Sequence, residues 1–308
     1  MSIADAWRGD FRAYCYLTLA FLFMALNVIV GRAAHTEIPP LGLSFWRWLT
    51  ASILFLPFAW RHCRDQWPLI RQNWRILLLL SVVMVPLGNN LIYVGLQDTT
   101  ALNGGLIPVA RPALILMLSW FLFRGTVTRH QWVGIAIAVA GVVMVLTRGQ
   151  PAILLQLDLN RGDLWLVGAS IGIALYQTLI GRVPRDIHPS ALLQVTMVLG
   201  TVMMLPPYLV ETLAGRPVEA TLPAVGAIVF TAIFPAICAV YLINAGIAIL
   251  GPARMSIFNY LPPLFVAAIA IPVLGEEPHW YHPVAFALVT IGIVISARRR
   301  KTGDPPQT

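Results

Sequence analysis

The chain has 308 residues, of which 58% are hydrophobic and 11% are charged. Soluble domains carry about 25% charged residues, so this composition excludes an ordinary soluble protein. The formal net charge of +8 does not indicate a nucleic-acid partner, because the basic residues lie mostly at the ends of long apolar segments. The 3 cysteines are isolated, so we expect neither a disulfide framework nor a metal site, and no cofactor.

The long apolar segments predict an all-α polytopic membrane protein with ten transmembrane helices, because about 20 apolar residues cross a hydrocarbon core. Each segment is continuously apolar, which is typical of spanning helices and not of a barrel. In chain order the expected spans are 13–31, 41–60, 74–96, 101–123, 132–146, 163–181, 190–210, 222–247, 253–274 and 280–297.

The placement of arginine and lysine predicts the orientation of these spans. With the N-terminus in the cytoplasm, most basic residues fall at cytoplasmic ends. Only Arg32, Arg148, Arg161 and Arg216 fall at outer ends. An odd number of spans would put the basic C-terminal tail outside. We therefore expect a multi-pass protein of the cell inner membrane with both termini in the cytoplasm.

The two halves of the chain match each other at a nearly constant offset, with Gly95 falling on Gly246 and Pro112 on Pro263. Five helices per half would make the repeats inverted, as in transporters that rock one half against the other around a site near the midplane. The expected organisation is a cytoplasmic tail (1–12), a first repeat (13–147), an outer linker (148–162), a second repeat (163–297) and a basic tail (298–308).

Several segments resemble the two EamA domains of the drug/metabolite transporter superfamily. They are ALNVIVGR and PPLGLSFWRWLTASILFLP in the first half, and GDLWLVGASIGIALYQTLIGR, YLPPLFVAAIAIPVLGEEP and VAFALVTIGIVIS in the second. Within the superfamily the sequence is most similar to the YddG-type amino-acid exporters, which implies a transporter of small metabolites. The first half has Arg124-Gly125 where the second has Gly275-Glu276, so the family's Gly-Glu pair is present only once.

Arg111 is the candidate site residue with the most specific chemistry, because it lies near the middle of the fourth expected span. A charge at this depth costs at least ~2.5–3.5 kcal/mol, so its side chain should face the bundle interior or a water-filled cavity. There the guanidinium would bind a substrate carboxylate or phosphate. Alternatively, it satisfies helix carbonyls beside Pro108 and Pro112.

Prolines at matching positions predict kinks in the fourth and ninth spans. Pro108 and Pro112 remove backbone donors in one, and Pro262 and Pro263 do so in the other. Carbonyls freed at this depth are tolerated only beside protein or water, so we expect a central cavity between these spans. Improved helix packing is the alternative interpretation.

Paired polar residues are expected to line that cavity. The repeat offset places Asn90 on Tyr241 and Tyr93 on Asn244, and we expect the two pairs at equivalent heights. Alternatively, these side chains only join helices. The further polar candidates are Asn27, Tyr176, Gln177, Asn103, Ser256 and Asn259. For Arg47, which lies between two tryptophans, we expect snorkelling to the headgroups rather than a place in the outer vestibule.

The expected function is export of small metabolites, most directly amino acids, by alternating access. Its partners would be a small-molecule substrate and the lipid bilayer. We expect facilitated diffusion or exchange, because Asp98, Asp163, Glu211 and Glu276 lie near span ends and leave no carboxylate at mid-depth. The alternatives are a lipid or polyisoprenoid flippase and a membrane-embedded enzyme. An enzyme is disfavoured by the lack of paired carboxylates or another reactive group of residues.

Overall fold

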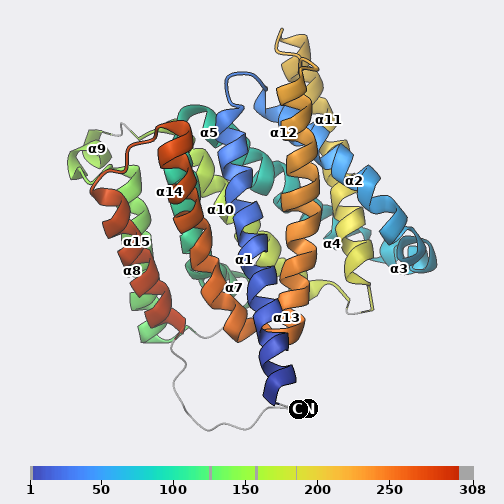
Figure 1. The fold of residues 1–308 in the computed structure, drawn as a ribbon, viewed down its shortest axis with the longest axis horizontal. Coiled ribbons are helices and arrows are strands. Elements are labelled where there is room, and N and C mark those ends of the chain that lie inside the picture. Colours follow the sequence, from blue (N-terminus) through green and yellow to red (C-terminus); the bar gives the residue numbers. More distant parts are fainter. Residues whose placement is uncertain (1–2, 125–126, 157–158, 185, 298–308) are drawn as a thin grey trace.

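The computed structural model describes residues 3–124, 127–156, 159–184 and 186–297, and among these it contains helices and no strand (Figure 1). Within these ranges, 8 helical segments are long and apolar enough to cross a membrane. Two shorter apolar helices, Phe258–Leu274 and Tyr281–Ser296, follow where the ninth and tenth spans are expected. The protein is therefore a multi-pass helical membrane protein.

The helices of the two halves follow one another in the same order. The first half contains α1 (Ile3–Ala33), α2 (Pro40–Asp65), α3 (Trp67–Gln72), α4 (Trp74–Met84), η1 (Val85–Asn90), α5 (Leu91–Asp98), α6 (Ala101–Leu106), η2 (Ile107–Ala110), α7 (Arg111–Phe123) and α8 (Arg129–Leu146). The second contains α9 (Pro151–Gln156), α10 (Arg161–Leu179), η3 (Ile180–Arg182), α11 (Pro189–Leu213), α12 (Leu222–Ile233), η4 (Phe234–Cys238), α13 (Ala239–Met255), η5 (Ser256–Tyr260), α14 (Leu261–Leu274) and α15 (Tyr281–Ala297).

Some of these bounds differ from the expected organisation. α1 begins within the expected N-terminal tail, and the short α9 lies within the expected linker. The expected basic tail, 298–308, lies outside the described residues.

Four spans are interrupted at matching places in the two halves. The third and eighth contain the π-helical turns η1 and η4, and the fourth and ninth contain the 3₁₀ turns η2 and η5. Each interruption contains or adjoins a proline, which removes a backbone donor and disfavours a regular α-helix. Pro108 lies in η2, and Pro262 lies in the first turn of α14. The π-helical turns at Pro86 and Pro235 were not predicted.

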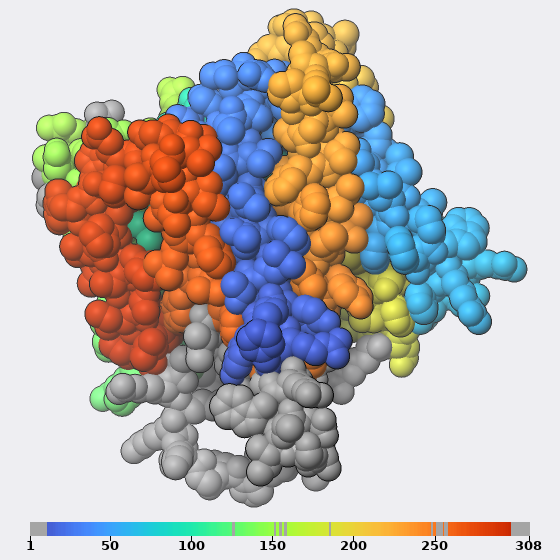
Figure 2. Space-filling view, viewed as in Figure 1, coloured from blue at the N-terminus to red at the C-terminus, as the bar shows by residue number. Residues whose placement is uncertain are grey.

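The packing of the helices is preserved when the two halves are exchanged. α1 packs against α13 and α14, while its counterpart α10 packs against α5 and α7. α2 pairs with α11, and α8 pairs with α15. Figure 2 shows α1 at the surface between α12–α13 on one side and α14 on the other. Inverted repeats require such interchangeable contacts.

The bundle has two ends. The basic face is the end at which α1 begins and α15 ends, at the lower edge of Figure 1. The distal face is the opposite one. Because the spans alternate in direction, α4 begins and α7 ends at the basic face, whereas α5 ends and α6 begins at the distal face.

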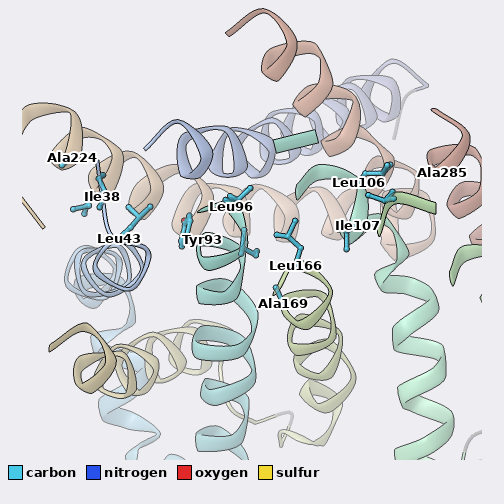
Figure 3. Packing of buried hydrophobic residues seen from close by; sticks show 13 residues of the cluster. Ile38, Leu43, Tyr93, Leu96, Leu106, Ile107, Leu166, Ala169, Ala224 and Ala285 are labelled. Carbon is cyan, nitrogen blue, oxygen red and sulfur yellow. The ribbon is translucent and has the colours of Figure 1, made fainter. Parts of the chain in front are cut away.

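The distal half of the bundle is tightly packed. A cluster containing Tyr93, Leu96, Leu106 and Leu166 joins α5, α6 and α10 (Figure 3). A second cluster joins α1, α6 and α14. All residues of α6 are buried, whereas Ala113 is the only buried residue of α7. The fourth span is therefore enclosed by protein in its distal half only.

Candidate functional site

Two adjacent glycines let the distal half of the fourth span touch both repeats. A Cβ atom at Gly104 would lie 2.9 Å from Val28 of α1, and one at Gly105 would lie 3.0 Å from Val266 of α14. α6 thus packs against α1 and α14 at close range. In the described parts of the chain, no comparable packing joins α4 or α7 to α13 or α14. Among the described residues, the fourth span therefore contacts the ninth at the distal face, but α4 and α7 do not pack closely on α13 or α14 toward the basic face.

Glu276 holds the beginning of α6 across the repeat boundary. Its carboxylate accepts hydrogen bonds from the backbone N–H groups of Ala101 (2.6 Å) and Leu102 (2.9 Å). A carboxylate is stabilised at a helix N-terminus by free N–H groups and by the helix dipole. The Nε atom of Arg32 lies 4.0 Å from the same carboxylate. The Nη1 atom of Arg32 donates to the Leu96 carbonyl at 2.8 Å.

Asp163 ties α10 to the connection between α5 and α6. It is 1% exposed and accepts hydrogen bonds from the Thr99 hydroxyl and from Asn103 Nδ2, the latter at 2.9 Å. The Asn103 Oδ1 atom lies 3.2 Å from His282 Nε2, which brings α15 into the same group. The acidic residues expected near span ends are thus placed there. Asp163, however, is buried and hydrogen-bonded, which position along the chain alone does not reveal.

Arg47 is buried inside the bundle, so the expectation that it snorkels to the headgroups is wrong. It is 3% exposed, and its Nε atom donates to the Thr231 carbonyl at 3.0 Å. That carbonyl would normally accept from the residue four positions later, which is Pro235 and has no N–H. The Nη1 atom of Arg47 donates to Asn89 Oδ1 at 3.3 Å. The proline of the unpredicted π-helical turn η4 therefore leaves free the α12 carbonyl that binds Arg47 inside the bundle.

Several predicted site residues lie beside Arg47. The Tyr93 ring is 5.6 Å from the Arg47 guanidinium carbon, within range of a cation–π interaction. The Tyr93 hydroxyl donates to Asn27 Oδ1 at 2.7 Å. Asn90 is 6% exposed, and its Oδ1 atom is buried without a hydrogen-bond partner. Arg47, Asn89, Tyr93 and Asn27 form a polar group, called the Arg47 group, between α1, α2, the third span and α12, and Asn90 lies three residues before Tyr93 in the same span.

Tyr241 and Asn244 are not brought next to Tyr93 and Asn90. A Cβ atom at Gly246 would lie 2.6 Å from Leu17 of α1, so α13 uses that face for packing. Tyr241 is 72% exposed, and Asn244 is exposed as well. Because the third and eighth spans run in opposite directions, α5 lies toward the distal face and α13 toward the basic face (Figure 1). The matched residues therefore lie toward opposite ends of the bundle and not at the equivalent heights that were expected.

Gln177 marks the point at which one face of α10 is no longer covered by protein. It lies eleven residues after Leu166 on α10, which at 3.6 residues per turn places both on the same helix face within about 20°. Leu166 is 1% exposed in the distal core, whereas Gln177 is exposed. Tyr176 instead packs against the cluster that contains Ile187. Asn259 is exposed in η5, and the side chain of Ser256 lies outside the described residues.

Arg111 begins α7, directly after η2. Its side chain is partly exposed, and its Nε atom is buried with no hydrogen-bond partner. Ala110 and Ala113 line an apolar cavity of about 200 Å³ between the fourth span, α8 and α10. Ser170 also lines this cavity, and its hydroxyl has no hydrogen-bond partner. Within the described ranges, no three potential metal ligands lie together.

The model of the EamA-like transporter family matches residues 11–147 and again residues 160–298. The chain belongs to the EamA-like transporter family. It is 28% identical to the uncharacterized transporter YyaM of Bacillus subtilis, over 92% of this chain and 94% of that protein. It is 24% identical to the uncharacterized inner membrane transporter YedA of Escherichia coli K12, over 89% of this chain and 87% of that protein.

A solved crystal structure has the same fold as this EamA-like chain. The TM-score is 0.59 at 17% identity, and the match covers 94% of this chain and 97% of the other. The EamA-like family and the relatives named as transporters indicate a membrane transporter rather than an enzyme. A transporter of this family acts on a small-molecule substrate within a lipid membrane.

Proposed function

We propose that the protein exports small metabolites, most directly amino acids, by alternating access of two inverted five-helix repeats with ten spans in all. The first repeat is 13–147 and the second 163–297, joined by the linker 148–162. We assign the basic face to the cytoplasm because arginine and lysine concentrate on the cytoplasmic side of membrane proteins. In this arrangement both termini are cytoplasmic.

The observation that carries this proposal is the difference between the two ends of the bundle. The fourth span is joined to the ninth at the distal face by α6, α14 and Glu276, whereas among the described residues α4 and α7 make no comparable contact with α13 or α14 toward the basic face. This is the arrangement of a carrier whose interior is open to one side. Exchange of the contacts at the distal and basic ends would open the interior to the other side.

The Arg47 group is the proposed substrate site. It is buried in the bundle and combines a guanidinium, an aromatic ring and amide groups. A carboxylate would pair with Arg47, and an ammonium group would bind the oxygens of Asn27 and Asn90. Arg111 would contribute a second cation nearer the basic face, where its Nε atom has no protein acceptor.

Energy coupling is proposed to be facilitated diffusion or exchange. Asp163 is buried, but its carboxylate is occupied by Thr99 and Asn103 and joins helices at the distal face. It therefore has a structural role that needs no proton or sodium ion. In proteoliposomes, uphill amino-acid accumulation driven by a pH or sodium gradient alone would contradict this coupling.

The test is counterflow of a panel of radiolabelled amino acids in proteoliposomes. Arg111→Ala should reduce transport at least about tenfold, as expected when a charge-assisted hydrogen bond is lost. Arg111→Lys should restore it only in part, because an ammonium group replaces the planar donor fork. Arg75→Ala, at an exposed position on α4, is the matched control. Unchanged counterflow in Arg111→Ala would remove this residue from the site.

The apolar cavity between the fourth span, α8 and α10 favours lipid flipping as a second candidate function. It is lined almost wholly by aliphatic side chains, with Ser170 as the polar exception. A fluorescent-lipid scrambling assay in the same proteoliposomes distinguishes the two functions. Scrambling without amino-acid counterflow would replace the first proposal by the second.

A further inference from the structure

Two arginines occupy equivalent places at the two ends of the bundle. Arg32 follows Gly31 at the end of the first span, and Arg182 follows Gly181 at the end of the sixth. At the distal face, Arg32 approaches the carboxylate of Glu276, the second residue after the ninth span. At the basic face, the guanidinium carbon of Arg182 lies 4.4 Å from the ring centroid of Phe123, the last residue of α7. Both arginines therefore approach the end of an equivalent helix.

The acid that would complete the arrangement at the basic face is missing from the sequence. The repeat offset places Gly125 where the second half has Glu276, and Pro252 where the first half has Ala101. Gly125 has no carboxylate, and Pro252 has no N–H to donate to one. Within the described part of the chain, Arg182 has no hydrogen bond or ion pair. The guanidinium is thus held in place by Phe123 while its donors remain free.

A pocket of about 490 Å³ opens beside Arg182. Asn73, directly before α4, lines it together with Ile76 and Leu79 of α4 and Phe123 of α7. The side-chain nitrogen of Asn73 already donates to the Leu69 carbonyl at 2.9 Å. Arg182 is the charged residue of the pocket lining. The pocket combines an apolar wall with one cation at its rim, which suits an amphipathic anion.

We propose that this pocket binds the carboxylate of an apolar substrate at the cytoplasmic entrance, in the place that the Glu276 carboxylate occupies at the other end. This assignment rests on the proposed function. The planar guanidinium would hold the carboxylate through two parallel hydrogen bonds, and Ile76 and Leu79 would contact the hydrocarbon part. An anionic lipid headgroup is the other source of the same oxyanion chemistry.

The test measures binding of 4-methylpentanoate and of its neutral amide to the full-length protein in phosphatidylcholine nanodiscs. Loss of a charge-assisted hydrogen bond corresponds to about tenfold in affinity. The wild-type protein should therefore bind the carboxylate about tenfold more tightly than the amide. Arg182→Gln should abolish that preference, and Arg182→Lys should keep part of it. Arg75→Gln, an arginine of α4 outside the pocket lining, should keep all of it.

Equal binding of the acid and the amide by the wild-type protein would overturn the proposal, as would an Arg182→Gln protein that keeps the preference. In nanodiscs that also contain phosphatidylglycerol, the carboxylate should still bind. Loss of carboxylate binding only in the nanodiscs that contain phosphatidylglycerol would assign the pocket to a lipid headgroup and overturn the substrate assignment. Since binding needs no transport, a protein that binds the probe but moves no amino acid would contradict only the proposed function.

Discussion

The two ends of the fourth span have similarly apolar sequences but are packed differently. α6, at the distal end, is buried throughout and is held by Glu276 and by close contact with α1 and α14. α7, at the basic end, has one buried residue and ends beside Arg182, which has no acid partner among the residues that the structure describes. Both are apolar helices in one span, so apolar sequence does not decide which end is sealed. A few polar contacts and two glycines decide it.

Replacing Glu276 should have the largest effect on this difference. Glu276→Ala removes two hydrogen bonds to a carboxylate, each worth about 1.5–3 kcal/mol, from the distal contact alone. Spin labels at the exposed positions Asp98 and Val273 should then report longer and broader distances in electron paramagnetic resonance. Glu277→Ala, its exposed neighbour, is the control and should leave the distances unchanged. Identical distance distributions in both variants would mean that Glu276 does not hold the distal end closed.

Gly105→Ala should have a smaller effect. The added Cβ atom would lie 3.0 to 3.1 Å from three atoms of Val266, so α6 and α14 would have to separate slightly. Overpacking of this kind costs about 1–3 kcal/mol. We expect a lower thermal unfolding temperature and a partial opening in the same distance measurement. Gly226→Ala is the matched control, because an added Cβ atom there meets nothing within 4 Å. A Gly105→Ala protein as stable as that control would show that the close approach is unimportant.

The smallest effect is expected from building the missing contact at the basic end. Gly125→Glu combined with Pro252→Ala supplies an acid and an N–H at the positions equivalent to Glu276 and Ala101. Because part of the gain is offset by ordering of the new side chain, we expect about 1 kcal/mol in favour of a closed basic end. Labels at Ile249 and Leu122, the exposed positions equivalent to Asp98 and Val273, should then show an added short-distance population. The single variant Pro252→Ala is the control, and no difference between the two would contradict the equivalence of the two ends.

The sequence predicted the spans and the repeat because both depend on local features. Continuous apolar segments and a constant offset of Gly and Pro can be read without knowing any contact. It could not predict that Arg47 is buried, since this depends on Thr231, whose carbonyl is free only because Pro235 follows four residues later. The missing N–H at Pro235 is a signal that could have identified this acceptor, although not its partner.

The candidate residues of the two halves differ in burial for the same reason, because burial depends on contacts that cannot be read from local sequence. Tyr93 and Asn27 lie together because the distal half of the bundle is closed around them. Tyr241 and Asn244, their counterparts by offset, lie in the half that is not closed and are exposed. Repeat symmetry predicts equivalent positions in the fold but not equivalent environments, because the two ends of the bundle are packed differently in this conformation.

Side-specific labelling of Gln177 tests the central claim that the interior is open to the basic face and closed to the distal one. Gln177→Cys and Asn103→Cys would be made separately in a protein whose three natural cysteines, Cys15, Cys63 and Cys238, are replaced by serine. A membrane-impermeant maleimide would be added to two vesicle preparations, one with the basic face outside and one with the distal face outside. Gln177→Cys should react from the basic face only, and Asn103→Cys from neither side. Rapid reaction of Asn103→Cys from the distal side, or none of Gln177→Cys from the basic side, would contradict the account.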